Sequence, residues 1–169
     1  MHEVPFVSQC DYAFASVACG VAATMMLLKF DHRRRRVPSY RELRESLGVY
    51  TGSPLPGLRN SVEGVEPEDV TKYFRQCGIR YRATHRNTLA TRTTLRRRLR
   101  RAPLMVGMGK HDRRWSKWGH WIVLIGIDSE TVTYLDPQFP CSHKRPGRLS
   151  IRDFRRQWDG SSIQIADRR

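Results

Sequence analysis

The sequence lacks any apolar run long enough to cross a membrane. Its longest apolar stretch covers residues 21–28, whereas a spanning helix needs about 20 residues. The first residues, Met-His-Glu-Val-Pro, also lack the basic and apolar regions of a signal peptide. We therefore expect no membrane span. We expect a cytoplasmic protein, or one exported by a route that needs no signal peptide.

Cysteine and histidine patterns typical of metal sites are missing too. The four cysteines form no CxxC pair, and the six histidines form neither HxxxH nor HExxH, so no metal site and no cofactor are predicted. A chain of 169 residues buries a sufficient core without disulfides. The cysteines are therefore expected to be free thiols.

Basic charge is present in large excess. Lys and Arg total 31 against 16 Asp and Glu, and 26 of the 31 are Arg. Residues 86–169 carry most of it, with 19 basic and 7 acidic residues against 12 and 9 in residues 1–85. Such an excess favours a partner with acidic segments, or nucleic acid. Because arginine content also follows genome base composition, the charge alone does not identify a function.

Hydrophobic periodicity predicts one α+β domain over residues 1–169, mainly helical over 1–101 and mainly antiparallel sheet over 102–169. A capping box, Ser39 with Glu42, and Pro67 at a helix start mark two of the helices. The expected helices are 18–30, 40–47, one from Pro67 to just before Gly78, 92–101 and 150–158. The expected strands are 79–84, 104–108, 120–127, 131–135 and 162–166.

Three residues form a candidate catalytic group. Cys19 opens a buried helix, where the helix dipole and free N–H groups stabilise a thiolate. His120 begins the most apolar strand, and Asp136 ends the next one. Residues that pair across a hairpin lie equally far from its turn, so their numbers add up to a constant, which is about 257 for a turn near Asp128. The numbers of His120 and Asp136 add up to 256. They are therefore predicted to lie together, with Asp136 orienting the imidazole and His120 taking the proton of Cys19.

Several neighbours are candidates for substrate contact. The amide of Gln9 is predicted to help stabilise an oxyanion beside the Cys19 N–H. Gly20 is expected to let a substrate backbone approach, and Gly119 precedes the histidine. Trp118 and Trp121 flank His120, and we interpret them as the wall of a peptide groove.

The sequence resembles the C39-like (bacteriocin-processing, double-glycine peptidase-like) branch of the papain-like cysteine peptidases. The segments that carry the resemblance are Val4-Pro-Phe-Val-Ser-Gln9, Cys19-Gly-Val-Ala-Ala-Thr-Met-Met-Leu27, Gly119-His-Trp-Ile-Val-Leu-Ile-Gly126 and Tyr134-Leu-Asp-Pro137. The resemblance implies a papain-like fold and a peptidase. It implies Cys19 as nucleophile, His120 as general base and acid, Asp136 as its orienting residue and Gln9 as oxyanion residue. The gap from Gln9 to Cys19 is longer than in many relatives and contains Cys10.

Three alternatives stay open on sequence alone. The same fold could catalyse another acyl transfer, such as deamidation or a toxin effector's reaction. The basic chain could be a nucleic-acid-binding module, with Trp115, Trp118 and Trp121 as a base-stacking surface, although we prefer to interpret these residues as the wall of a peptide groove. It could also be a pseudoenzyme that binds without cleaving. We favour a thiol-dependent peptidase or amidase that cleaves peptide bonds of a peptide or protein substrate through a thioester.

Overall fold

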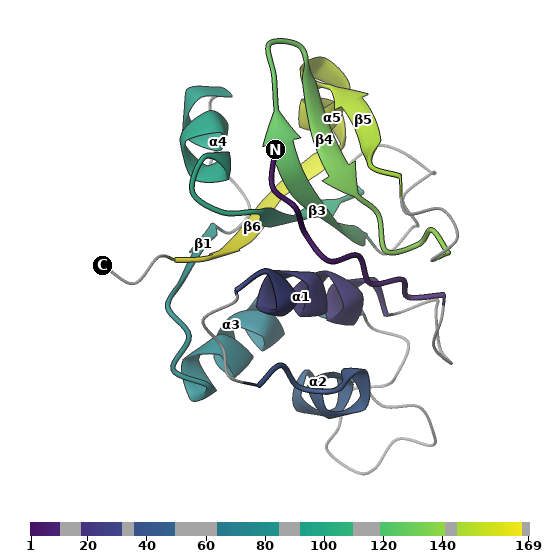
Figure 1. The fold of residues 1–169 in the computed structure, drawn as a ribbon, viewed down its shortest axis with the longest axis vertical. Coiled ribbons are helices and arrows are strands. Elements are labelled where there is room, and N and C mark those ends of the chain that lie inside the picture. Colours follow the sequence, from purple (N-terminus) through teal and green to yellow (C-terminus); the bar gives the residue numbers. More distant parts are fainter. Residues whose placement is uncertain are drawn as a thin grey trace.

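The computed structural model describes residues 1–10, 18–31, 36–49, 64–84, 92–109, 119–140 and 145–166. Within them lie five helices and six strands (Figure 1). The helices are α1 (Cys19–Phe30), α2 (Tyr40–Ser46), α3 (Pro67–Gln76), α4 (Arg92–Leu99) and α5 (Ile151–Gln157). The strands are β1 (Tyr81–Thr84), β2 (Leu104–Met108), β3 (His120–Ile127), β4 (Thr131–Leu135), β5 (Gly147–Ser150) and β6 (Trp158–Ile165).

The strands form one sheet in the order β1-β6-β2-β3-β4-β5, and every neighbouring pair is antiparallel. Strand β3 lies inside the sheet, between β2 and β4, and its first six residues are all buried. This accounts for its nearly continuous apolar sequence, because a strand covered on both faces has no solvent side to make polar. The α+β architecture expected from the sequence is confirmed.

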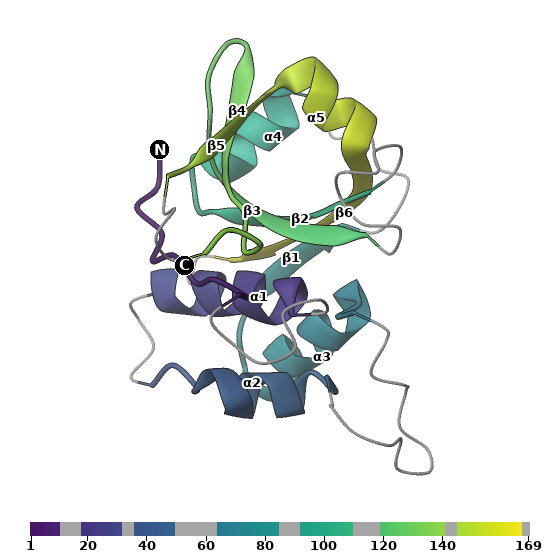
Figure 2. The ribbon, with the colours of Figure 1, turned by 90° about the vertical axis from the view of Figure 1, so that its right-hand side faces the viewer.

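Helices cover both faces of the sheet (Figure 2). Helices α1, α2 and α3 lie on one side, where Trp121, Val123 and Ile125 of β3 join their core. Helices α4 and α5 lie on the other side, where Ile122 and Leu124 join a second core. The alternation of neighbouring β3 residues between two cores follows from the two-residue period of a strand.

Local signals in the sequence set most helix ends. The capping box of α2 forms as predicted, with Ser39 accepting from the Glu42 N–H and Glu42 accepting from the Ser39 N–H. Pro67 occupies the first turn of α3. Gly48 and Gly78 follow α2 and α3 with φ of +75° and +64°, a region that other residues enter at a cost.

Two strands differ from the prediction. Strand β5 was not expected, because the four residues Gly-Arg-Leu-Ser carry no alternation strong enough to detect. Strand β6 begins at Trp158 rather than Ser162, directly after α5.

The register of the β3–β4 hairpin is offset from the predicted one. Val123 pairs with Leu135, and a bulge follows Leu124. The hairpin sum is therefore 258 to 259 instead of about 257.

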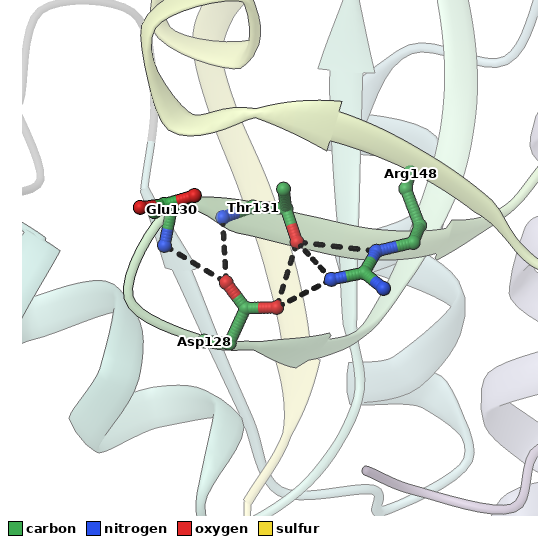
Figure 3. Close-up of polar contacts among 4 residues, drawn as sticks. All are labelled: Asp128, Glu130, Thr131 and Arg148. Atoms are coloured by element: carbon green, nitrogen blue, oxygen red, sulfur yellow. Dashed lines mark hydrogen bonds and ion pairs between the residues drawn. The ribbon is translucent and has the colours of Figure 1, made fainter.

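The turn between β3 and β4 is fixed by Asp128 (Figure 3). Its Oδ1 accepts from the Glu130 and Thr131 backbone N–H groups at 2.8 and 2.7 Å. Its Oδ2 accepts from Thr131 Oγ1 at 2.8 Å and from an Arg148 nitrogen at 2.7 Å. These hydrogen bonds, the backbone ones foremost, hold the pKa of Asp128 far below its ordinary value. Arg148 lies on β5, so the same carboxylate ties the edge strand to the turn.

No helix in the described ranges is long and apolar enough to span a membrane. The thiols of Cys10, Cys19 and Cys77 are free, as predicted, while Cys141 lies outside the described residues.

The low pKa of Asp128 predicts an acid-sensitive hairpin. A carboxyl whose folded-state pKa is depressed stabilises the fold above its unfolded pKa of about 4 and loses that effect as the pH falls. We expect the thermal midpoint of the wild type to fall below that pH more steeply than that of Asp128→Asn. Glu130→Gln is the control, because the Glu130 backbone makes the contact. Equal acid slopes for wild type and Asp128→Asn would contradict the assignment.

Candidate active site

His120 and Asp136 meet where β3 begins and just after β4 ends. His120 Nε2 lies 2.6 Å from Asp136 Oδ1, and the two side chains are only 5% and 6% exposed. Asp136 Oδ1 also accepts from the Gln138 backbone N–H at 2.8 Å. This tight turn, which includes Pro137, fixes the carboxylate, and the carboxylate in turn fixes the orientation of the imidazole.

Cys19 contacts the other side of the imidazole. It is the first residue of α1 and is buried, and its side chain forms a hydrogen bond with His120. Since Nε2 faces Asp136, this bond leaves Nδ1 as the ring nitrogen toward the thiol. The structure thus brings together the three residues that the sequence grouped.

The charge state of His120 reflects both neighbours. Burial, the largest single influence, lowers the pKa of His120 because it disfavours the charged ring. Hydrogen bonds to Asp136 and Cys19, together with the negative charges of these groups when ionised, outweigh burial and raise the pKa to about 9. A protonated imidazole is therefore favoured between the sulfur and the carboxylate.

The N-terminal segment joins the same turn. The Gln9 backbone N–H donates to the Pro137 carbonyl at 2.8 Å, and Gln9 is buried. The neighbouring Cys10 is exposed, and its sulfur lies 2.9 Å from the Gln138 carbonyl oxygen. The structure therefore places Gln9 against the loop that holds Asp136. Eight residues, 11–18, lie between Cys10 and the start of α1.

A close packing contact positions the start of α1. A Cβ added to Gly20 would lie 2.4 Å from Val65 Cβ and 3.1 Å from Trp121 Cδ1. Trp121 is 7% exposed and donates its indole N–H to the Val65 carbonyl at 2.7 Å. Gly20 follows Cys19 and Trp121 follows His120, so this junction sets how closely α1 approaches β3.

The structure places some of the substrate-contact candidates. Trp121 packs in the core beside α1 and donates to the Val65 carbonyl. At 7% exposed it is buried to the same extent as Cys19 and His120, so its place in a groove wall stays a prediction. The space beside Gly20 is filled in the same way, and substrate contact there stays a prediction. Gly119 is exposed with φ of +85°, and Trp118 lies outside the described residues.

Sequence reasoning missed two residues of this site. Val65 lies in residues 48–66, which the sequence predicts only as a long loop, so nothing in the sequence marks it as the acceptor for Trp121. Gln138 could have been found, because Asp-Pro-x is a turn in which the Asp side chain bonds the backbone two residues on.

The site offers thiol chemistry. Among the described residues, no group of three or more His, Cys, Asp or Glu is arranged to hold a metal ion. A thiol hydrogen-bonded to an imidazole that is itself oriented by a carboxylate is an arrangement that activates a nucleophile.

Comparison with known proteins agrees with this geometry. The model of a family described as "Peptidase_C39 like family" matches residues 1–165. The chain belongs to this family. Membership makes it a cysteine peptidase by class and confirms the resemblance seen in the sequence. A search of the curated proteins finds no match.

Solved structures share the fold of this C39-like chain. A protein described as a C39-like peptidase from Bacillus anthracis has a TM-score of 0.71 at 15% identity, covering 98% of this chain and 96% of that one. The peptidase domain of Streptococcus ComA, a bifunctional ABC transporter, has a TM-score of 0.65 at 19% identity, with 99% and 100% covered. A double glycine motif protease from an AMS/PCAT transporter, in complex with its leader peptide, has a TM-score of 0.64 at 16% identity, with 96% and 91% covered.

The Gly20 junction predicts a specific loss of function. Gly20→Ala forces Val65 or the start of α1 to move, at a cost of about 1–3 kcal/mol for an overpacked core. We expect a lower thermal midpoint and a slower reaction of Cys19 with a thiol probe. Gly64→Ala is the matched control, since nothing lies within 4 Å of a Cβ added there. A Gly20→Ala protein that matched the wild type in both measurements would refute this role.

The raised pKa of His120 predicts a loss of stability in alkali. A histidine whose folded-state pKa is raised stabilises the fold fully below its unfolded pKa of about 6.5. That stabilisation is lost as the pH rises toward the folded-state pKa of about 9. Urea unfolding between pH 6 and 9.5 should show the decline in the wild type and a flatter profile in Asp136→Asn. An identical decline in both proteins would exclude Asp136 as a cause.

Proposed function

We propose that this cysteine peptidase cleaves peptide bonds through Cys19, with His120 and Asp136 completing the catalytic group. The observation that supports the proposal most is the single buried imidazole that bonds Cys19 on one side and Asp136 on the other. Cys19 begins α1, His120 begins β3 and Asp136 follows β4, so their meeting is a product of the fold and not of local sequence.

The first half-reaction forms a thioester. The Cys19 sulfur, as a thiolate beside the His120 imidazolium, attacks the carbonyl carbon of the scissile peptide bond. His120 then donates its Nδ1 proton to the leaving amine, the C–N bond breaks, and the acyl group stays on sulfur. Asp136 keeps the ring oriented and favours its charged form throughout.

The second half-reaction consumes water. His120, now neutral, takes a proton from a water molecule, whose oxygen attacks the thioester carbonyl carbon. The C–S bond breaks, which releases the carboxylic acid and restores the thiolate–imidazolium pair. Both tetrahedral intermediates carry an oxyanion, for which we propose two donors: the Cys19 backbone N–H at the start of α1 and the side-chain amide of Gln9.

The start of α1 is suited to that charge. Ala18 precedes Cys19 and makes no side-chain cap. The helix dipole adds a partial positive charge at this end.

A peptide is the proposed substrate. The double glycine motif protease with a similar fold was solved with a leader peptide, and the excess of basic charge favours substrates that carry acidic segments.

Replacing Cys19 tests the proposal. Cys19→Ala should lower the cleavage of a peptide library, read by mass spectrometry, by at least about 10³-fold, since the nucleophile is removed. Iodoacetamide followed by peptide mapping should label Cys19 ahead of Cys10 and Cys77 in the wild type. Cys77→Ala, at an exposed thiol beyond α3, is the control and should cleave normally.

Three outcomes would overturn the mechanism. Cleavage that survives Cys19→Ala would remove its nucleophile. Preferential labelling of Cys10, with loss of activity in Cys10→Ala, would assign the reaction to the neighbouring thiol. A gain of one dalton at glutamine residues without any cut would indicate a deamidase instead of a peptidase.

A further inference from the structure

Helix α4 carries an unusual concentration of one charge. Residues 92–101 include six arginines and no acidic residue. Arg98 is turned inward: it is buried and donates to Ser162 Oγ at 2.9 Å and to the Arg82 carbonyl at 3.3 Å. Arg97, Arg100 and Arg101 are exposed, and Arg96 is half-buried.

These outward arginines are not neutralised by the described part of the chain. The ion pairs found there lie elsewhere, on Arg36, Arg41, Arg148 and Arg156 and on the His120–Asp136 pair. Arg100 directly follows α4, and its backbone N–H donates to the Arg96 carbonyl at 3.0 Å. The helical spacing of four residues, at which like charges repel, therefore continues between Arg96 and Arg100. The helix dipole favours basic residues in the last turn, which includes Arg96 and Arg97, but its partial negative charge of about one half is smaller than the summed charge of the four outward arginines. An anionic ligand would relieve the repulsion directly.

A groove lies beside these arginines. It has a volume of about 610 Å³ and runs between α4, the end of β3 and the first two residues of the chain. Arg96 and Arg100 form one side, and Leu99, Ile125 and Ile127 contribute apolar surface. A second hollow of about 460 Å³ shares Arg96 and Arg100 and adds Arg97 and Thr93. No acidic residue lines either of them among the described residues.

The groove is held open by specific contacts. The His2 backbone N–H donates to the Ile125 carbonyl at 2.8 Å, and its ring nitrogen Nε2 hydrogen-bonds to the Leu99 carbonyl. The same ring packs edge-on against Phe30 at 5.3 Å between centroids. The N-terminal wall is therefore fixed to both α4 and β3, and a ligand would meet a preformed surface.

We propose that this groove binds a polypeptide segment that carries acidic and apolar side chains together. The arginines match carboxylates, and the aliphatic surface matches apolar side chains. A nucleic acid fits less well, because none of the described residues lining the groove is a Phe, Tyr or Trp on which a base could stack.

The groove is separate from the candidate active site. Ile125 and Ile127 lie five and seven residues along β3 from His120, a span of roughly 17–23 Å at about 3.3 Å per residue. The surface therefore goes beyond the proposed function, and a bound segment leaves the Cys19–His120 pair accessible.

Fluorescence polarisation with Cys19→Ala as the background protein tests binding without cleavage. The probe is a labelled 16-residue peptide of alternating glutamate and leucine pairs. We expect it to bind more weakly as salt rises, and to bind at least about tenfold more weakly to Arg96→Glu/Arg100→Glu. Arg152→Glu/Arg155→Glu, which makes the same charge change at exposed positions of α5, should change the affinity less than about twofold.

The controls separate this surface from general electrostatics. Arg96→Gln/Arg100→Gln repeats the test without reversing charge, and thermal unfolding confirms that each variant is folded. A serine–glutamate peptide, which lacks the leucines, should bind several-fold more weakly than the probe.

Equal weakening by the α4 and α5 variants would overturn the proposal. So would equal binding of the two peptides, or tighter groove-dependent binding of a 20-nucleotide single-stranded DNA. Iodoacetamide labelling of Cys19 in the otherwise wild-type protein is scored separately. A failed binding test with intact labelling therefore rejects the groove and leaves the proposed peptidase mechanism standing.

Discussion

The close approach of α1 to β3 is the constraint on which the rest of the site depends. A helix and a strand can bring their first residues into hydrogen-bonding contact only if nothing bulky separates them, and Gly20 supplies that space. Val65 and Trp121 fill it, and the indole N–H bond to the Val65 carbonyl is buried. A buried acceptor left without its donor costs free energy, so the junction resists sliding. The Cys19–His120 contact is thus maintained by apolar packing one residue away from each partner.

The second requirement is met by the β3–β4 hairpin. His120 and Asp136 are 16 residues apart, and the hairpin returns the chain to bring them together. Its turn is fixed by a carboxylate that accepts from two backbone N–H groups, and its other end is closed by the His120–Asp136 bond. A bulge after Leu124 shifts the register, yet the end of the hairpin that holds His120 and Asp136 still closes, because the Asp136 turn is set by its own bond to the Gln138 N–H.

Much of this fold could be predicted from the sequence because its signals are local. The capping box at Ser39, Pro67 at the start of α3 and the apolar run of β3 each act within a few residues. His120 and Asp136 could be paired because strand ends and a hairpin impose simple arithmetic, and Cys19 could be added to them from its place at the start of a buried helix and from the family resemblance. The contact between Trp121 and Val65 could not be predicted, because it joins residues 56 positions apart. The sequence also does not say which face of β3 is covered by α1, and so it does not say whether Trp121 faces that helix. Strand β5 was missed for a related reason: four residues at a sheet edge form a strand through their partner, β4, and not through their own pattern.

Residues 2 to 9 run from the proposed peptide-binding groove beside α4 to the candidate active site. His2 is fastened beside the basic groove by its backbone and its ring, and Gln9 is fastened beside Asp136 by its backbone N–H. Between these two contacts the segment belongs to no helix or strand, but Val7 is buried in the core beside α1, and Val4 and Phe6 pack against that core. A ligand that moved one contact would change the free energy of holding the other. Because such coupling is reciprocal, a substrate bound beside Gln9 and a peptide bound in the groove would change each other's binding free energy by the same amount.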